Sequence, residues 1–200
     1  TGAEVSAISL GTWSYGGANK SGELPVGWAG QSDDDSKLAL KRAWELGINH
    51  WDTADVYGNG RSEQMIGSMW GSIPRKDIFI ATKVGWDRGH QKHWYNIDVM
   101  RQNMERSLIN LKTDCVDLMY LHHCNFGENE EYFDDEELVK LIEEAQKNNI
   151  TLKMNFNGSG KVPFISIVIS IVFDAKFALY ENIFDSCIER FRCSPKITYV

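Results

Sequence analysis

The chain has 200 residues, of which 42% are hydrophobic and 24% are charged, and its formal net charge is −7. This composition is ordinary for a globular domain that can bury a sizeable core. The negative net charge and the lack of a basic stripe argue against a nucleic-acid-binding protein, so small molecules or other proteins are the expected partners. Four cysteines with wide, irregular spacing indicate neither a disulfide framework nor a zinc site, and they favour a cytoplasmic protein with reduced thiols.

Neither end of the chain suggests secretion or membrane insertion. No basic segment followed by an apolar run is present at the N-terminus, so no signal peptide is predicted. The longest nearly continuous apolar stretch, Val162 to Phe173, is shorter than the roughly 18 residues that a spanning helix needs. Because the first residue is Thr1 rather than Met, we expect a fragment or a processed product.

Strand and helix patterns alternate four times up to about residue 148. The strands are predicted at Val5–Leu10, Ile48–Trp51, Ile78–Ala81 and Cys115–Leu121. The helices are predicted to begin at Ser32, Ser62, Asn96 and Asp134, where small polar or acidic residues can cap them. This alternation is typical of a parallel sheet built from right-handed βαβ units.

Details of the first two units are also predicted. The segment from Gly16 to Gly30 reads as a polar, glycine-rich loop. Leu38, Ala39, Ala43, Trp44 and Leu46 are expected to form the apolar stripe of the first helix, and Gly47 is expected to end it in the left-handed conformation. In the second helix, the core face is expected to consist of Met65, Ile66, Met69 and Trp70.

The pattern changes at Asn149. The following residues are rich in Gly, Asn and Ser, and then Phe164 to Phe173 is almost entirely β-branched or aromatic. We therefore predict an α/β fold, a partial (β/α)8 barrel of roughly four βα units over residues 1–148, with a divergent tail over 149–200.

Four polar side chains lie at or just beyond predicted strand ends: Asp52, Tyr57, Lys83 and His122. In a barrel of parallel strands the carboxyl ends meet at one mouth, so these side chains are expected to converge. An ammonium group beside a phenol stabilises the phenolate, and a carboxylate keeps that ammonium charged. Together with an imidazole, such a group could protonate a carbonyl oxygen while a hydride reaches its carbon.

The segments around these residues resemble the aldo-keto reductase family, in the branch that it shares with potassium-channel β-subunits. The matching segments are Thr1–Ser6, Leu10–Trp13, Gly47–Gly58 with Gly60–Glu63 and Gly67, Ala81–Lys83 and Thr113–His122. The resemblance extends over about residues 1–148.

The resemblance implies a role for each residue. Tyr57 is the general acid and base, Lys83 adjusts its acidity, Asp52 pairs with that lysine, and His122 orients the carbonyl group. It further implies NADP(H) as the cofactor, held in part by Asp52 and by Gly11, Thr12 and Trp13. The substrate is then a small carbonyl compound or alcohol. Trp13, Trp86 and His123 are expected to line its pocket, with simple loop packing as the alternative.

The chain departs from the family after residue 148. No counterpart is found for the fifth-strand segment that binds the cofactor's carboxamide, nor for strands six to eight. The alternative interpretation is therefore a truncated, non-catalytic barrel fragment that binds a protein partner, as channel β-subunits do.

Three other short motifs are present in the sequence. Gly58-Asn59-Gly60 lacks the third glycine of a dinucleotide fingerprint. His122-His123-Cys124 does not predict a metal site, because adjacent strand residues point to opposite faces. The triplet that starts at Asn157 is a glycosylation sequence, which we expect to be unused without a secretory signal.

Overall fold

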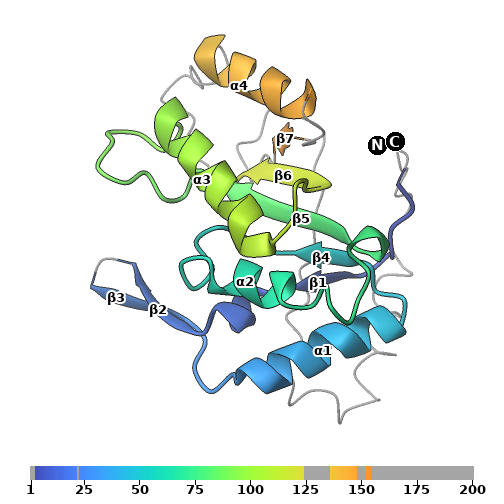
Figure 1. Cartoon of the computed structure of the whole chain (residues 1–200). Helices are drawn as coiled ribbons and strands as arrows, with labels where there is room; N and C mark the ends of the chain where they lie inside the picture. The colour runs from blue at the N-terminus through green and yellow to red at the C-terminus, as the bar shows by residue number, and fades with distance from the viewer. Residues whose placement is uncertain (1–2, 22, 124–135, 148–151, 155–200) are drawn as a thin grey trace, which may run out of the picture.

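The computed structural model describes residues 3–21, 23–123, 136–147 and 152–154 (Figure 1). Five strands form its main sheet: β1 (Ser9–Gly11), β4 (His50–Asp52), β5 (Phe79–Val84), β6 (Leu118–Leu121) and β7 (Leu152–Met154). Their order is β1-β4-β5-β6-β7, and each neighbouring pair is parallel. The predicted parallel α/β sheet is therefore confirmed.

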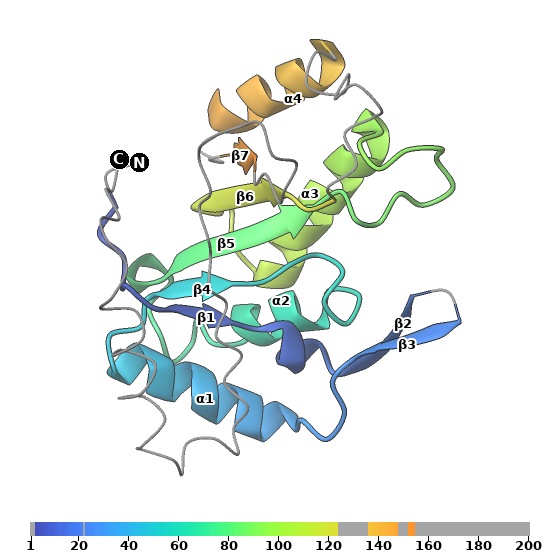
Figure 2. The same cartoon turned by 180° about the vertical axis from the view of Figure 1, so that it is seen from behind.

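The helices cover one face of this sheet, as the two opposite views show (Figures 1 and 2). They are α1 (Asp33–Glu45), α2 (Arg61–Gly67), α3 (Ile97–Leu111) and α4 (Glu136–Lys147), with short 3-10 helices η1 (Trp13–Gly16) and η2 (Arg75–Asp77). Within the described residues, no helix is long and apolar enough to cross a membrane.

Two of the predicted helix starts are confirmed by their caps. The Ser32 side chain accepts a hydrogen bond from the Asp35 N–H at 3.1 Å, and the Asn96 side chain accepts one from the Val99 N–H at 3.2 Å. Each bond satisfies a backbone donor that the first helical turn leaves free. Gly47 also has the expected left-handed conformation, with φ of 76°.

The two faces of the sheet bury different side chains because successive strand residues point to opposite sides. Trp51, Ile80 and Met119 point toward the helices and are each 0% exposed in the main core. On the other face, Ala81, Leu118 and Tyr120 form a separate, smaller cluster. In the register of the sheet, Asp52 pairs with Ala81, and Lys83 pairs with Tyr120. Asp52 and Lys83 therefore lie on this inner face, away from the helices.

The predicted loop over Gly16–Gly30 is wrong, because this segment contains an antiparallel hairpin. Strand β2 (Ala18–Ser21) pairs with β3 (Leu24–Gly27) in a sheet of its own. The hairpin projects from the end of the main sheet at which the strands terminate (Figures 1 and 2). Its strands are short and contain Asn, Lys, Ser, Pro and Gly, so no alternation of apolar and polar residues predicts them.

The predicted faces of the first two helices need correction. Leu38 and Leu46 are 65% and 60% exposed, because the buried stripe of α1 consists of Ser36, Leu40 and Ala43 at helical spacing. Helix α2 begins at Arg61 with Gly60 as its cap, not at Ser62, and it ends at Gly67. Met69 and Trp70 thus follow the helix, although both still pack in the core.

A fifth parallel strand, β7, lies beside β6 within the segment assigned to the divergent tail. The change of pattern expected at Asn149 therefore does not end the sheet. Strand β5 also extends beyond the predicted Ala81 to Val84, because Thr82 and Lys83 pair with β6. The predictions for Cys124, for the triplet at Asn157 and for Phe164–Phe173 lie outside the described residues.

Candidate active site

The Lys83 ammonium group is the centre of a buried polar cluster on the inner face of the sheet. Its Nζ lies 2.6 Å from Asp52 Oδ1, 2.8 Å from the Thr53 carbonyl oxygen and 3.2 Å from the Tyr57 hydroxyl. The three donors of an ammonium group are thus matched by three oxygens. The Asp52 and Lys83 side chains are only 4% and 13% exposed, so the ion pair is largely shielded from water.

This shielding has opposing effects on the lysine. Burial disfavours the ammonium and by itself lowers the pKa of Lys83, but the Asp52 carboxylate and Tyr57 outweigh it and leave the pKa raised above the ordinary value. Lys83 therefore stays positively charged, and its ammonium group favours the phenolate form of any phenol that it contacts.

His122, which directly follows β6, completes the cluster. Its ring lies edge-on to the Tyr57 ring, with centroids 6.0 Å apart. Burial and then the charge of Lys83 lower the pKa of His122 to about 3, so the imidazole is neutral at physiological pH. Its Nδ1 is buried and has no hydrogen-bond partner among the described residues. A neutral imidazole has one N–H donor, which can bind a carbonyl oxygen.

The backbone around Asp52 is fixed by a buried hydroxyl network. Thr12 donates from both its N–H and its Oγ1 to the Asp52 carbonyl oxygen, each at 2.9 Å. Ser62 Oγ in turn donates to the Thr12 carbonyl oxygen at 2.8 Å and accepts from Thr53 Oγ1 at 3.0 Å. These bonds connect β1, β4 and α2, so the end of β4 has one defined position.

A second buried network lies behind Lys83 and was not predicted from the sequence. Glu63 is 0% exposed and accepts hydrogen bonds from Thr82 Oγ1 at 2.8 Å and Asn110 Nδ2 at 3.1 Å. Burial raises the pKa of its carboxyl group, while these bonds oppose the rise. Thr82 precedes Lys83 in β5, so the network fixes that strand to α2 and α3. The one sequence signal was Glu63 itself, in the segment that resembles the family.

Asp55 is a further buried carboxyl group that the sequence analysis did not single out. It is 0% exposed, and both carboxylate oxygens lack a hydrogen-bond partner in the described part of the chain. Burial first, and the nearby Glu63 second, raise the pKa of Asp55 to about 8, whereas Arg106 opposes the rise. Asp55 is thus mostly protonated at neutral pH.

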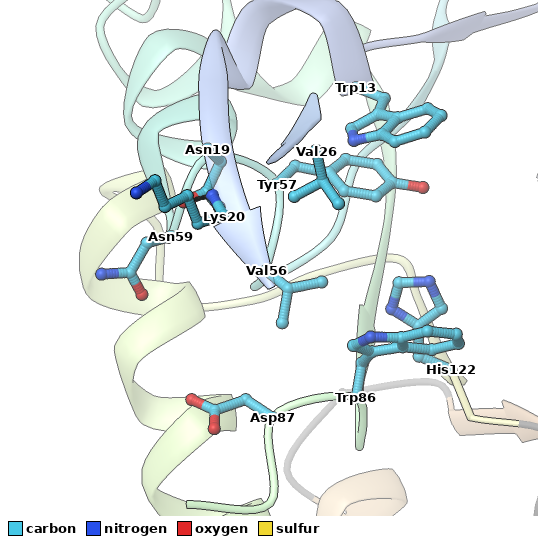
Figure 3. A pocket seen from close by; sticks show the side chains of 10 residues that line it. All are labelled: Trp13, Asn19, Lys20, Val26, Val56, Tyr57, Asn59, Trp86, Asp87 and His122. Atoms are coloured by element: carbon cyan, nitrogen blue, oxygen red, sulfur yellow. Dashed lines mark hydrogen bonds between the residues drawn. The ribbon is translucent and has the colours of Figure 1, made fainter. Parts of the chain in front are cut away.

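An open cavity of about 650 Å³ adjoins the cluster (Figure 3). It is lined by Trp13, Asn19, Lys20, Val26, Val56, Tyr57, Asn59, Trp86, Asp87 and His122. Of the residues expected at the substrate pocket, Trp13 and Trp86 line the cavity and His123 does not. His123 instead stacks on Trp94, with centroids 3.7 Å apart.

The residues expected to hold a cofactor differ in their accessibility. Gly11 is buried, and Thr12 and Asp52 are 0% and 3% exposed. Trp13 is 41% exposed, and its ring lies 6.1 Å from that of Tyr57. No group of three or more His, Cys, Asp or Glu side chains that could hold a metal ion is found among the residues that the structure describes.

Comparison with known proteins gives one consistent family. The Aldo/keto reductase family matches residues 7–166, which runs past residue 148, where the resemblance seen in the sequence ends. The uncharacterized oxidoreductase YqkF of Bacillus subtilis is 34% identical over 152 residues, or 74% of this chain and 43% of the relative. A putative voltage-gated potassium channel subunit beta of Schizosaccharomyces pombe is 38% identical over 91 residues, covering 44% of this chain and 24% of the relative. The chain thus spans less than half the length of these relatives.

Solved structures agree with the sequence comparison. A holo-form aldo-keto reductase from Bacillus halodurans has a TM-score of 0.55 and 28% identity, over 75% of this chain and 46% of that one. An aldo-keto reductase from Klebsiella pneumoniae in complex with NADPH has a TM-score of 0.54 and 25% identity, over 75% and 45%. The partial-barrel fold is therefore confirmed.

Proposed function

The chain belongs to the aldo/keto reductase family, and we propose that it carries the catalytic half of an oxidoreductase that interconverts aldehydes or ketones with alcohols, using NADP(H). The observation that supports this most directly is the position of Lys83 Nζ. It lies 2.6 Å from the Asp52 carboxylate and 3.2 Å from the Tyr57 hydroxyl, beside an open cavity. The structures similar to this chain include a reductase in complex with NADPH.

The described residues fit the nicotinamide end of that cofactor. Tyr57, His122 and the exposed Trp13 line one cavity, and His122 Nδ1 is a buried polar atom without a partner in the described part of the chain. We propose that Trp13, with Gly11, Thr12 and Asp52 beneath it, holds this end. When bound, the reduced nicotinamide supplies the hydride that reaches the carbonyl carbon.

We propose one role for each side chain, and the contacts within the cluster support these roles. Tyr57 gives its hydroxyl proton to the carbonyl oxygen, so its O–H bond breaks as the alcohol O–H bond forms. The Lys83 ammonium stabilises the phenolate that remains, and Asp52 holds that ammonium in place. The neutral His122 donates a hydrogen bond to the same carbonyl oxygen and orients it. In the direction of alcohol oxidation, the phenolate takes the proton back.

The test is the reduction of an aldehyde by the chain at millimolar NADPH, compared between wild type and Tyr57→Phe. The substitution removes the proton donor but keeps the ring, so turnover should fall by about 10²- to 10⁴-fold. Tyr15→Phe is a matched control, because it removes the hydroxyl of a buried tyrosine that has no hydrogen-bond partner among the described residues and does not line the cavity. If Tyr57→Phe kept the wild-type turnover, Tyr57 would not be the general acid.

A second candidate function is that of a non-catalytic binding protein. It is favoured by the match to a channel β-subunit and by the fraction of its relatives that the chain spans. In that case the wild-type chain would show no carbonyl reduction at any NADPH concentration, and Tyr57→Phe would leave the binding of a protein partner unchanged. We further propose a division of the chain into two regions, with residues 1–148 as the oxidoreductase region and residues 149–200 as the divergent region.

A further inference from the structure

The β2–β3 hairpin forms one wall of the cavity, although it belongs to neither the main sheet nor the helical layer. It contributes Asn19, Lys20 and Val26 to the lining. Asn19 and Val26 are direct cross-strand partners, and such partners share one face of a hairpin. That face is therefore turned toward Tyr57 and His122, across the cavity.

The hairpin is fixed at its base next to the catalytic cluster. The Trp28 N–H donates to the Gly17 carbonyl oxygen at 3.1 Å and closes the base. The Trp28 ring contacts Trp13 edge-on, with centroids 5.9 Å apart, and Trp13 contacts Tyr57. A chain of aromatic contacts thus sets the position of the hairpin relative to the phenol that we propose as the proton donor.

The two halves of the cavity differ in chemistry (Figure 3). One half is lined by the rings of Trp13, Tyr57, Trp86 and His122, and the Trp86 and His122 centroids are only 5.1 Å apart. The other half carries the polar side chains of Asn19, Lys20, Asn59 and Asp87, and Val26 and Val56 lie between the halves.

Apolar side chains remain exposed around the ring-lined half. Trp13, Val26 and Trp86 are 41%, 37% and 43% exposed, so a ligand that covered them would remove apolar surface from water. Flat faces of indole, phenol and imidazole rings are best covered by another flat ring, through stacked or edge-to-face contacts.

We propose that the β2–β3 hairpin selects the substrate, and that it selects carbonyl compounds carrying a flat aromatic ring, for which Val26 limits the space beside Tyr57. This proposal rests on the proposed function, because it assumes that the carbonyl group binds at Tyr57 and His122. The ring lies in the aromatic half, between the indoles and Val26. Polar substituents on the ring extend toward Asn19 and Asn59.

The test measures binding alone, by calorimetry on the whole chain. The ligands are 2-naphthylmethanol and its fully saturated, decahydro counterpart, two alcohols of similar size that form no Schiff bases with lysine. The flat alcohol should bind at least about tenfold more tightly, since stacked ring pairs add affinity beyond that of the buried area and several rings line the site. Equal affinities, or no binding of the flat alcohol, would overturn the proposal.

Substitutions in the hairpin test the role of Val26. Val26→Trp fills the space beside Tyr57 and should weaken binding of the flat alcohol at least about tenfold. Leu38→Trp adds the same indole on α1, at a side chain that is 65% exposed and does not line the cavity. It should leave the affinity within about twofold. If Val26→Trp kept the wild-type affinity for the flat alcohol, Val26 would not limit the space beside Tyr57.

A smaller substitution covers the case in which the added indole disturbs the hairpin. Val26→Ala removes two methyl groups from the wall and should weaken binding of the flat alcohol about threefold to tenfold, by loss of apolar contact. No change in this variant would also count against the proposal. Because no turnover is measured, these results are independent of Tyr57→Phe, which tests the proposed function.

Discussion

At the scale of single residues, the Lys83–Asp52 pair is expected to have a large effect on stability. Both side chains are nearly buried, and their atoms are 2.6 Å apart. A buried charge that loses its partner keeps its desolvation cost without the compensating attraction. Each charge is therefore expected to depend on the other, independently of the net contribution of the pair to stability.

The first prediction concerns this pair. Lys83→Met should lower the free energy of unfolding by about 3–5 kcal/mol, because Asp52 is left as an unpaired buried carboxylate. The double variant Lys83→Met/Asp52→Asn should recover part of the loss. Arg101→Ala breaks a pair that is half exposed and should cost at most about 1 kcal/mol. Chemical denaturation of the wild type, these three variants and the single variant Asp52→Asn measures these values, and purely additive effects of the two pair substitutions would argue against the coupling.

The second prediction concerns Asp55, whose pKa burial raises to about 8 from an ordinary value of 3.8. Between these two pH values the unfolded chain has lost the Asp55 proton while the folded chain retains it. The contribution of Asp55 to stability is thus most favourable below about pH 4 and is lost progressively as the pH rises to about 8. Each pH unit in this window corresponds to about 1.4 kcal/mol, so the total reaches a few kcal/mol.

Asp55→Asn removes this titration. Relative to wild type, the variant should become steadily more stable as the pH rises from about 4 to 8, and the difference should then level off. The exposed Asp114 supplies a matched control, Asp114→Asn, for the loss of one carboxyl group elsewhere in the chain. Thermal unfolding across this pH range measures the difference, and a constant offset between Asp55→Asn and wild type would show that Asp55 is ionised in the folded protein.

At the scale of elements, the turn after β4 is positioned by a close backbone approach. Gly58 has φ of 61°, and a Cβ atom at this position would collide with the Gly16 carbonyl group in η1. Gly47 has φ of 76°, but the space around it is open. The turn that carries Tyr57 therefore needs a glycine both for its left-handed conformation and for the close approach of Gly16. The end of α1 needs a glycine for its conformation alone.

The third prediction separates these two effects. Gly47→Ala should cost about 1 kcal/mol, the strain of a left-handed alanine. Gly58→Ala should cost roughly 2–4 kcal/mol, because the collision with the Gly16 backbone adds to the same strain. It should also reduce carbonyl turnover, since Tyr57 precedes it directly. Equal losses of stability in the two variants would mean that the contact between η1 and the turn relaxes easily.

The elements that could be predicted from the sequence are those specified by local interactions. Ser32, Asn96 and Gly47 act through bonds or backbone angles within a few residues, so a short sequence window contains the whole signal. The hairpin and β7 were missed for the opposite reason. Strand β7 has only three residues and is defined by its pairing with β6. A short sequence window contains no information on that pairing.

The same distinction applies to the candidate site. Asp52 and Lys83 could be expected to converge because parallel strands align their carboxyl ends, and in the structure their side chains are in contact. The inner face on which they lie follows from the register of the sheet. The environment of Glu63 could not be predicted, because its partners Thr82 and Asn110 come from a strand and a helix far away in sequence. The sequence pattern wrongly assigns Leu38 to the buried stripe, because it does not distinguish a leucine at the edge of the stripe from one at its centre.

At the scale of the whole molecule, the strands that the structure describes form an open main sheet. Within the described part of the chain it ends at β1 on one side and at β7 on the other. An unpaired strand edge offers backbone donors and acceptors to another chain. Our fourth prediction is that the chain self-associates, with an average mass by sedimentation velocity that rises with concentration. A single monomeric species up to about 100 μM would contradict this reading of the open edges.

The last prediction concerns how much of the cofactor this chain can hold. In (β/α)8 barrels, phosphate groups are frequently bound by the loops after strands seven and eight, whereas the described part of this chain has five parallel strands in its main sheet. Within the described residues, Lys20 is the only lysine or arginine that lines the cavity. The chain should therefore bind the nicotinamide end and gain little from the adenosine half and its phosphates. NADPH and reduced nicotinamide mononucleotide should then bind with dissociation constants within about threefold of each other, as measured by fluorescence titration. If NADPH bound more than about tenfold tighter, a phosphate site would have to exist in this chain outside the cavity described above.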